Sequence, residues 1–160
     1  MDKDGKIFFT EVQKMRQPWV WAIIFLPLAL VIWQWKDLMP NPVMLIVPLM
    51  MGIICPLLFY ICNLKTEVCG DGLYFRFFPF QLSFHKISIS DIQTYASRTY
   101  RPIMEYGGWG LRYSLRYGRA YNVSGNRGVQ LTLNNGNKIL FGSQKPEEFV
   151  EALKKVMPGI

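Results

Sequence analysis

The chain has 160 residues and a formal net charge of +7. Its three cysteines are an odd number without a C-x-x-C pair, which argues against a disulfide framework. The single histidine, His85, leaves too few ligands for a zinc site. We therefore predict neither a metal nor a cofactor, and at this length one small domain beside the apolar segments described below.

Residues 1–17 precede the first long apolar run and read as a juxtamembrane segment. Thr10 to Gln13 fits a capping box, and Phe8, Val12 and Met15 recur at helical spacing. This pattern predicts a short amphipathic segment lying on the inner leaflet of a membrane.

Two long uncharged runs follow, separated by the adjacent charges of Lys36 and Asp37. Pro18 to Trp35 holds 18 residues and Pro42 to Cys62 holds 21. Helices of these lengths reach roughly 27 and 31 Å, close to a hydrocarbon core of about 30 Å. The alternative is a buried helical hairpin, but the remaining chain is too short to wrap two such helices. We predict a transmembrane hairpin over residues 18–64, with spans of about 18–35 and 42–62.

Tryptophans flank the first run, and indole rings favour the level of the lipid headgroups. The candidate interface anchors are Trp19, Trp21, Trp33 and Trp35. Basic residues concentrate before the first run and after the second, whereas the connection has Lys36 alone. We expect a multi-pass protein of the cell membrane with both termini in the cytoplasm.

Beyond residue 65 the apolar residues take the two-residue period of strands, and this part carries 13 Lys and Arg against 7 Asp and Glu. Gly70 to Gly72 and Asn134 to Asn137 are turn signals between apolar runs and predict hairpins. Residues 111–116 alternate between apolar or aromatic and polar or basic side chains. This alternation predicts a strand with one core face and one basic face. The core face would hold Leu111, Tyr113 and Leu115, and the basic face Arg112, Ser114 and Arg116.

A C-terminal helix is predicted over about residues 146–157. Pro146 suits its first turn, acidic residues follow at 147 and 148, and lysines occupy 154 and 155, as the helix dipole favours. With the hairpin, this gives a membrane α-helical hairpin joined to a mainly β domain over residues 65–160. The β domain has the outline of a pleckstrin-homology-like curled sheet or barrel of six to seven antiparallel strands, capped by this helix.

Three segments of the chain support a resemblance to a known family. They are Glu105 to Arg112 with its Gly-Gly-Trp-Gly sequence, Gly125 to Val129, and the Gly-Ser-Gln-Lys-Pro-Glu-Glu sequence from Gly142 to Glu148. Together with the apolar runs, they resemble bacterial membrane proteins of unknown function that carry a pleckstrin-homology-like domain. The resemblance implies a fold and a membrane location, and it implies no catalytic residues.

No set of residues in the chain has the spacing of a catalytic site, so we do not expect an enzyme. There is no nucleophile elbow, and the Gly-Gly-Trp-Gly segment lacks the Lys-Ser or Lys-Thr of a P-loop. Its glycines fit a turn or a bulge before a strand.

The candidate binding residues are basic and aromatic side chains between positions 98 and 121. They are Arg98, Arg101, Trp109, Arg112, Arg116 and Arg119. Arginine binds phosphate through a bidentate fork, and anionic lipid attracts basic residues near the membrane surface. The alternative is a solvated outer face with tyrosines in the core.

The function expected from the sequence is a non-catalytic, membrane-anchored binding or scaffold module. Its basic cytoplasmic domain would contact anionic headgroups or a membrane protein partner, with the lipid bilayer itself as the anchor. The alternative is a structural subunit of a homo-oligomeric or hetero-oligomeric membrane assembly. The same composition would suit single-stranded nucleic acid, but nothing else in the chain resembles a nucleic-acid module.

Overall fold

The computed structural model describes residues 6–33 and 43–157. The chain divides into two compact units. Residues Met1–Lys14 and Asn63–Ile160 form one, which we call the β unit, and Met15–Cys62 form the other, the helical unit. The helical unit is therefore an insertion between the first strand and the rest of the β unit.

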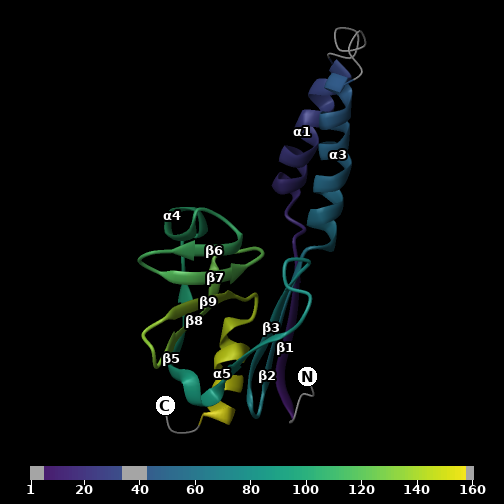
Figure 1. Cartoon of the computed structure of the whole chain (residues 1–160). Helices are drawn as coiled ribbons and strands as arrows, with labels where there is room; N and C mark the ends of the chain where they lie inside the picture. Colours follow the sequence, from purple (N-terminus) through teal and green to yellow (C-terminus); the bar gives the residue numbers. More distant parts are fainter. Residues whose placement is uncertain (1–5, 34–42, 158–160) are drawn as a thin grey trace. The chain divides into compact units, whose positions relative to one another are not determined.

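The helical unit contains α1 (Pro18–Trp33) and α3 (Val43–Ile61), which pack against each other (Figure 1). Trp21 stacks on Phe25 one turn later, with ring centroids 6.1 Å apart. Trp19 and Trp33 also lie on α1, whereas Trp35 and the connection from Lys36 lie outside the described residues.

Within the described residues, no helix is long and apolar enough to cross a membrane. α1 has 16 residues, which gives about 24 Å against a hydrocarbon core of about 30 Å. The predicted transmembrane hairpin is therefore wrong, and so is the expected location as a multi-pass membrane protein with cytoplasmic termini. The length of an uncharged run sets only an upper limit on the length of the helix that forms within it.

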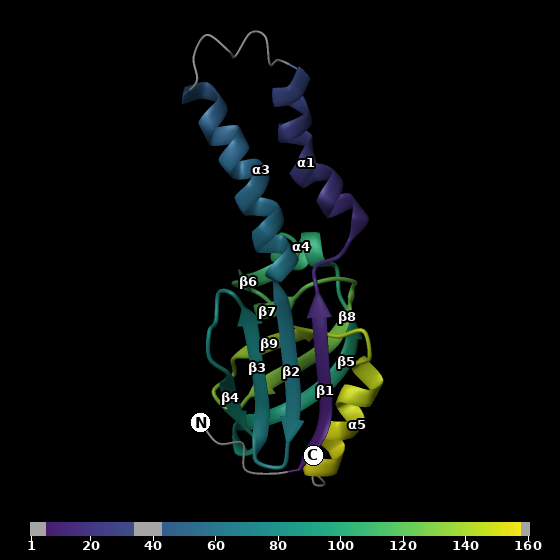
Figure 2. The same ribbon diagram turned by 90° about the vertical axis from the view of Figure 1, so that its right-hand side faces the viewer.

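Two β-sheets make up most of the β unit (Figure 2). The first sheet is antiparallel and consists of β1 (Ile7–Lys14), β2 (Asn63–Cys69), β3 (Gly72–Phe78) and β4 (His85–Ser88), in that order. The second has the order β5-β8-β9-β7-β6 and consists of β5 (Ile92–Thr99), β6 (Gly110–Ser114), β7 (Gly118–Asn122), β8 (Arg127–Leu133) and β9 (Lys138–Gly142). Strands β7 and β9 run parallel and the other pairs are antiparallel.

Three short elements complete the β unit. The 3₁₀ turn η1 (Ile89–Asp91) joins the two sheets, and α4 (Pro102–Tyr106) lies between β5 and β6. The C-terminal helix α5 (Pro146–Val156) packs against β1 and β2 of the first sheet and β5 and β8 of the second (Figure 2). It therefore closes the side of the sandwich at which β1 and β5 are the edge strands.

Aromatic rings fill the space between the sheets. Phe75 on β3 contacts Tyr121 on β7 and Phe141 on β9, with centroid separations of 4.7 and 4.9 Å. Phe149 of α5 stacks on Phe9 of β1 at 4.9 Å. The apolar face of α5 is thus buried in the same core as both sheets, which is why this amphipathic helix docks there.

The architecture corrects the predicted fold class. The nine described strands, in two sheets with a parallel pair, differ from a curled sheet or barrel of six to seven antiparallel strands behind a membrane hairpin. Both turn signals were placed correctly, because Cys69 pairs with Gly72 and Thr132 with Lys138 across antiparallel strands.

The first strand is a further difference from the sequence prediction. Residues 7–14 pair with β2 instead of forming an amphipathic segment on a membrane. Phe9 and Gln13 are buried on one face, while Val12 is exposed on the other. The helical spacing of Phe8, Val12 and Met15 did not produce a helix. Residues 7–14 form a strand instead, because they pair with a strand about 50 residues away.

Candidate binding groove at the β6 edge

Strand β6 is the edge of the second sheet, and the face that was predicted to be its core face is exposed. Leu111, Tyr113 and Leu115 were expected in the core, but 48%, 67% and 95% of their surfaces are exposed. Leu111 and Tyr113 do point to the inner face, in register with Tyr121 and Arg119 of β7. That face is open here because α5 closes only the opposite side of the sandwich.

The other face was expected to be the basic one, and Arg112 on β6 is exposed there, whereas the same face of the neighbouring strand β7 is buried. Arg112 is in register with Ala120, which is fully buried. Ala120 packs with Leu140 beneath Tyr100 and Tyr106, and Tyr106 belongs to α4. The α4 segment therefore helps to bury the outer face of the sheet at Ala120, while Arg112 beside it stays exposed.

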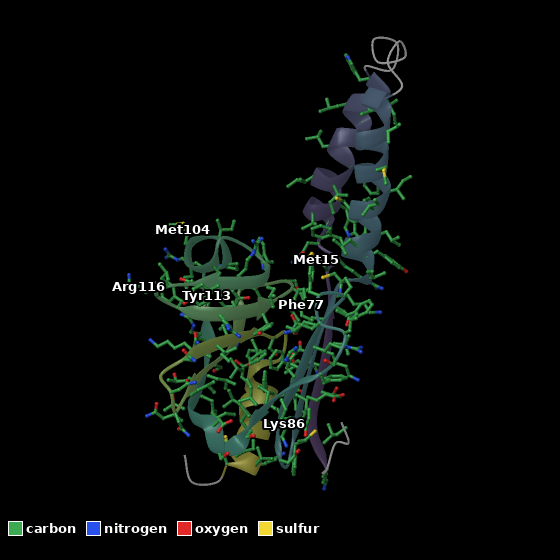
Figure 3. The ribbon with its side chains drawn as sticks, in the orientation of Figure 1. Met15, Phe77, Lys86, Met104, Tyr113 and Arg116 are labelled. Atoms are coloured by element: carbon green, nitrogen blue, oxygen red, sulfur yellow. The ribbon has the colours of Figure 1, made fainter. Side chains whose placement is uncertain are left out.

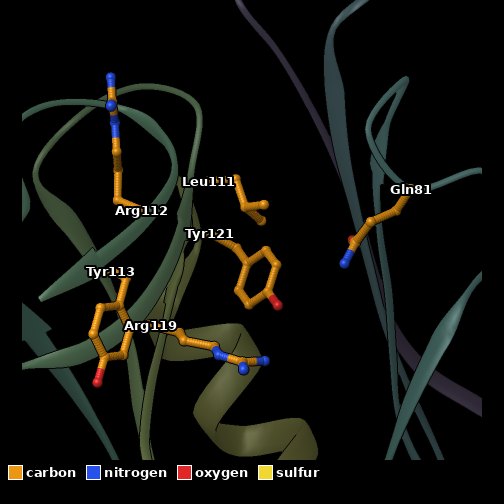
Figure 4. Close-up of a pocket in the computed structure, with 6 residues that line it drawn as sticks. All are labelled: Gln81, Leu111, Arg112, Tyr113, Arg119 and Tyr121. Carbon is orange, nitrogen blue, oxygen red and sulfur yellow. The ribbon is translucent and has the colours of Figure 1, made fainter.

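A groove of about 290 Å³ lies along the open inner face (Figure 4). Leu111, Tyr121 and Arg119 point toward its interior, and Gln81 lies across from them on the loop after β3 (Figure 4). The remaining lining residues are Arg112 and Tyr113. The groove therefore combines apolar and aromatic surface with the Arg119 guanidinium, while the Arg112 side chain lines it but points away from Gln81, and no acidic side chain lines it (Figure 4).

Local hydrogen bonds hold the groove in shape. The Gln81 side chain accepts a hydrogen bond from the Phe77 backbone N–H at 3.0 Å, and the Gln81 N–H donates to the Phe77 carbonyl at 2.8 Å. Arg112 Nε donates to the Trp109 carbonyl at 2.9 Å. Gly110, at the start of β6, donates its N–H to Asn122 Oδ1 at 2.9 Å. These contacts fix the loop and strand on which the lining residues lie.

Arg112 and Arg119 are the only two of the six candidate binding residues that line this groove. Arg98, on β5, instead pairs with Glu105 at 2.6 Å and donates to the Tyr106 hydroxyl at 3.2 Å. Burial lowers the pKa of Arg98, but these two hydrogen bonds outweigh it, and the net shift is upward. Arg98 is therefore part of the attachment of α4 to the sheet.

The remaining three candidates lie around the groove without forming it. The backbone N–H of Arg101 donates to Glu105 at 2.8 Å, and its side chain is exposed. Arg116, in the turn after β6, lies over the Tyr117 ring at 5.4 Å. Trp109 Nε1 donates to the Gly125 carbonyl at 2.8 Å, which ties the glycine-rich loop to the turn before β8.

Exposed apolar side chains also occur on α4 and on the loop after β3. On the β6 side, Ile103 and Met104 of α4 are exposed. On the opposite side, Phe80 and Leu82 flank Gln81 and are exposed as well. Figure 3 shows Met104, Tyr113 and Arg116 at the same end of the β unit, away from Lys86. Phe80 and Leu82 therefore add exposed apolar surface next to Gln81, which lines the groove.

Sequence reasoning missed four lining residues, because Leu111 and Tyr113 were predicted in the core and Gln81 and Tyr121 were not among the candidate binding residues. Tyr121 belongs to the aromatic stretch already noted, and its inward direction follows from register with Leu111. Gln81 carries no local signal, because only the folding of the loop after β3 places it opposite β6.

Fold and groove together define a two-sheet β protein with a C-terminal helix and an open basic groove at one sheet edge. A model described as "Family of unknown function (DUF6141)" matches residues 2–159, so the chain belongs to this family. No curated protein and no solved structure matches the chain. The expected kinship with bacterial membrane proteins carrying a transmembrane hairpin and a pleckstrin-homology-like domain is therefore corrected to this family, since no described helix can span a membrane.

Proposed function

We propose that the chain is a non-catalytic binding module whose β6 groove takes an extended acidic segment of a protein partner. The observation that carries this proposal is the composition of the groove. Arg112 and Arg119 lie beside Leu111, Tyr113 and Tyr121, and no lining residue is acidic. Arginine and tyrosine are the residues that most often dominate the energy of protein interfaces.

The position of β6 explains why the bound segment would be extended. An edge strand presents backbone N–H and C=O groups that a further strand can pair with, which supplies affinity independent of sequence. Alternate side chains of that strand would face the groove, since side chains alternate along a strand. Apolar side chains would meet Leu111 and Tyr121, and carboxylates would meet the guanidinium groups.

The groove lacks the groups that catalysis needs. Its lining holds two arginines, two tyrosines, a leucine and a glutamine, without a carboxylate, histidine, serine or cysteine beside them. General acid–base catalysis requires a group that titrates near the working pH, and nucleophilic catalysis requires an activated nucleophile. Binding is the activity that these side chains support.

The experiment measures binding of a probe peptide to the whole chain. The probe is an N-acetylated hexapeptide amide that alternates glutamate with valine and phenylalanine, and the same peptide with lysine in place of glutamate is the charge control. We expect only the acidic peptide to bind. Arg119→Glu should weaken its binding by at least about tenfold, and added salt should weaken binding to the wild-type protein.

Lys155→Glu on α5 is the matched control variant, because it reverses an exposed charge away from the groove. It should bind the acidic peptide like the wild-type chain. Equal binding of the acidic and basic peptides, or of the wild-type and Arg119→Glu proteins, would refute the proposal.

A second candidate is that the same edge joins copies of this chain into an assembly. The observation favouring it is the exposure of Leu111 and Tyr113 on an edge strand and of Leu115 directly after it, because an exposed edge strand is a recognised route to strand pairing between molecules. Mass measurement across a concentration series separates the two candidates. A dimer that Tyr113→Lys dissociates supports assembly, whereas a monomer at every concentration excludes it in the homo-oligomeric form.

A further inference from the structure

The outer face of the first sheet carries a pair of basic residues directly opposite each other. Lys65 on β2 is in register with Arg76 on β3. Their neighbours Leu64 and Phe77 are in register on the inner face and are buried, so Lys65 and Arg76 point outward. Cross-strand partners have Cβ atoms about 5 Å apart, and like charges at such positions destabilise a sheet.

Aromatic rings hold the arginine of this pair. The Arg76 guanidinium lies 5.0 Å from the ring centroid of Phe84 and 5.8 Å from that of Phe78. Lys65 Nζ lies 5.7 Å from the same Phe84 ring. Both cations therefore converge on one ring, and cation–π contacts orient the guanidinium without occupying its hydrogen-bond donors.

The positive charge of this pair is only partly compensated. Lys65 pairs with Glu67 at 2.9 Å, on the same strand and the same face. Among the described residues, Arg76 makes no ion pair, and its buried Nε has no hydrogen-bond partner. By contrast, the next basic residue on this face, Lys86, is paired with Asp71 at 2.5 Å. Arg76 therefore lies opposite a lysine, and a single carboxylate, that of Glu67, pairs with that lysine.

We propose that Lys65 and Arg76 form a binding site for a phosphate group, separate from the β6 groove. A phosphate dianion carries a charge of about −1.5 to −2 and three acceptor oxygens, which matches one guanidinium fork and one ammonium. A bound phosphate would offset the repulsion between the two cations. Inorganic phosphate and a phosphomonoester share this chemistry.

The test is calorimetric titration of the whole chain with inorganic phosphate, at an ionic strength held constant with sodium chloride. We expect binding in the millimolar range, and Arg76→Gln should weaken it by about tenfold or more. Arg116→Gln is the matched control, because Arg116 also lies over an aromatic ring, that of Tyr117, but has no lysine in register with it. Arg116→Gln should bind phosphate like the wild-type chain.

Two further variants keep the outcome decisive. Lys65→Gln alters a partly exposed side chain and should also weaken binding, so it carries the test if Arg76→Gln does not fold. Arg119→Glu in the β6 groove should leave phosphate binding unchanged, which separates this site from the proposed function.

Repeating the titration with O-phosphoserine shows whether the site accepts a phosphomonoester or only the free ion. Wild-type affinity in both Arg76→Gln and Lys65→Gln, or no heat beyond that of chloride, would overturn the proposal.

Discussion

At the scale of single residues, Gly118 decides whether the neighbouring strands β7 and β9 of the second sheet can approach each other. It begins β7 with φ of 79°, in the left-handed region. A Cβ placed on it would lie 2.1 Å from the Lys138 carbonyl oxygen at the start of β9. Glycine is therefore required here both by the backbone conformation and by the neighbouring strand.

We predict that Gly118→Ala lowers the free energy of unfolding by about 2–4 kcal/mol, because left-handed strain and a backbone clash add together. Gly136→Ala is the matched control. Gly136 has φ of 80° but nothing within 4 Å of the added Cβ, so about 1 kcal/mol is expected. Chemical denaturation measures both, and equal losses in the two variants would contradict the role of the clash.

Tyr100 shows how burial of one polar group sets a pH dependence. Its ring is 1% exposed and packs edge-on against Tyr106 at 6.1 Å. Burial raises the pKa of the Tyr100 hydroxyl from 10.0 to about 12, against an opposing effect of Asn122. The folded state therefore holds this proton more tightly than the unfolded chain does.

The expected consequence is a loss of stability in alkali. The contribution of Tyr100 is intact below pH 10, where both states are protonated, and it is lost as the pH rises toward 12. The loss should be about 1–3 kcal/mol across this window. Denaturation at a series of pH values should show a smaller loss in Tyr100→Phe, while the exposed control Tyr113→Phe keeps the wild-type profile. An unchanged alkaline loss in Tyr100→Phe would contradict this cause.

At the scale of elements, β1 joins the N-terminal and C-terminal parts of the β unit. Glu11 accepts hydrogen bonds from the Ser143 hydroxyl at 2.6 Å and from the Gln144 N–H at 2.8 Å. Gln13 donates its side-chain amide to the Gly142 carbonyl at 2.6 Å. These polar contacts lie where β9 ends and the chain turns toward α5, so they attach the edge of the first sheet to the loop of the second.

We predict that Glu11→Ala lowers the free energy of unfolding by about 1.5–3 kcal/mol, the range for hydrogen bonds to a charged group. Glu148→Ala is the control. Its carboxylate pairs only with Lys145 on the exposed face of α5, and its removal should cost less than about 0.5 kcal/mol. A Glu11→Ala protein as stable as Glu148→Ala would show that the β1 contacts do not hold the two sheets together.

At the scale of the whole molecule, the helical unit interrupts a sheet at a hairpin position. Lys14 at the end of β1 is in register with Asn63 at the start of β2. The Met15 N–H donates to the Cys62 carbonyl at 3.4 Å, so the two chain segments are still side by side where the helical unit begins. A two-residue turn spans such a pair of antiparallel strands.

We therefore predict that replacing residues 15–62 by an Asn-Gly turn leaves a β unit that folds by itself. All of the aromatic core between the sheets lies outside the deleted segment. The expected result is a cooperative unfolding transition and dispersed amide resonances. A shortened chain that is unfolded in native buffer would show that the β unit depends on the helical unit.

Local features of the fold were predictable where neighbouring residues determine them. The Asn-Asn-Gly-Asn turn and the turn at Gly70 to Gly72 each connect strands that pair directly. Pro146, the acidic first turn and the basic last turn mark α5 over Pro146–Val156, where a helix over about 146–157 was expected. Composition predicted Arg112 and Arg119, which line the groove. It also predicted Arg98 and Trp109, which do not line it, because they bond to Glu105 and to the Gly125 carbonyl instead.

By itself, the sequence determined the basic charge of the β unit, its turns and its amphipathic C-terminal helix, because each depends on residues close together in the chain. Only the tertiary structure decided that residues 7–14 form a strand, that α4 buries the face of Ala120, and that β6 is left with an open groove. The physical reason is that pairing and burial in a sheet depend on partners far away in sequence. Helical spacing at β1 and alternation at β6 report which side chains share a face, and the rest of the fold decides what covers that face.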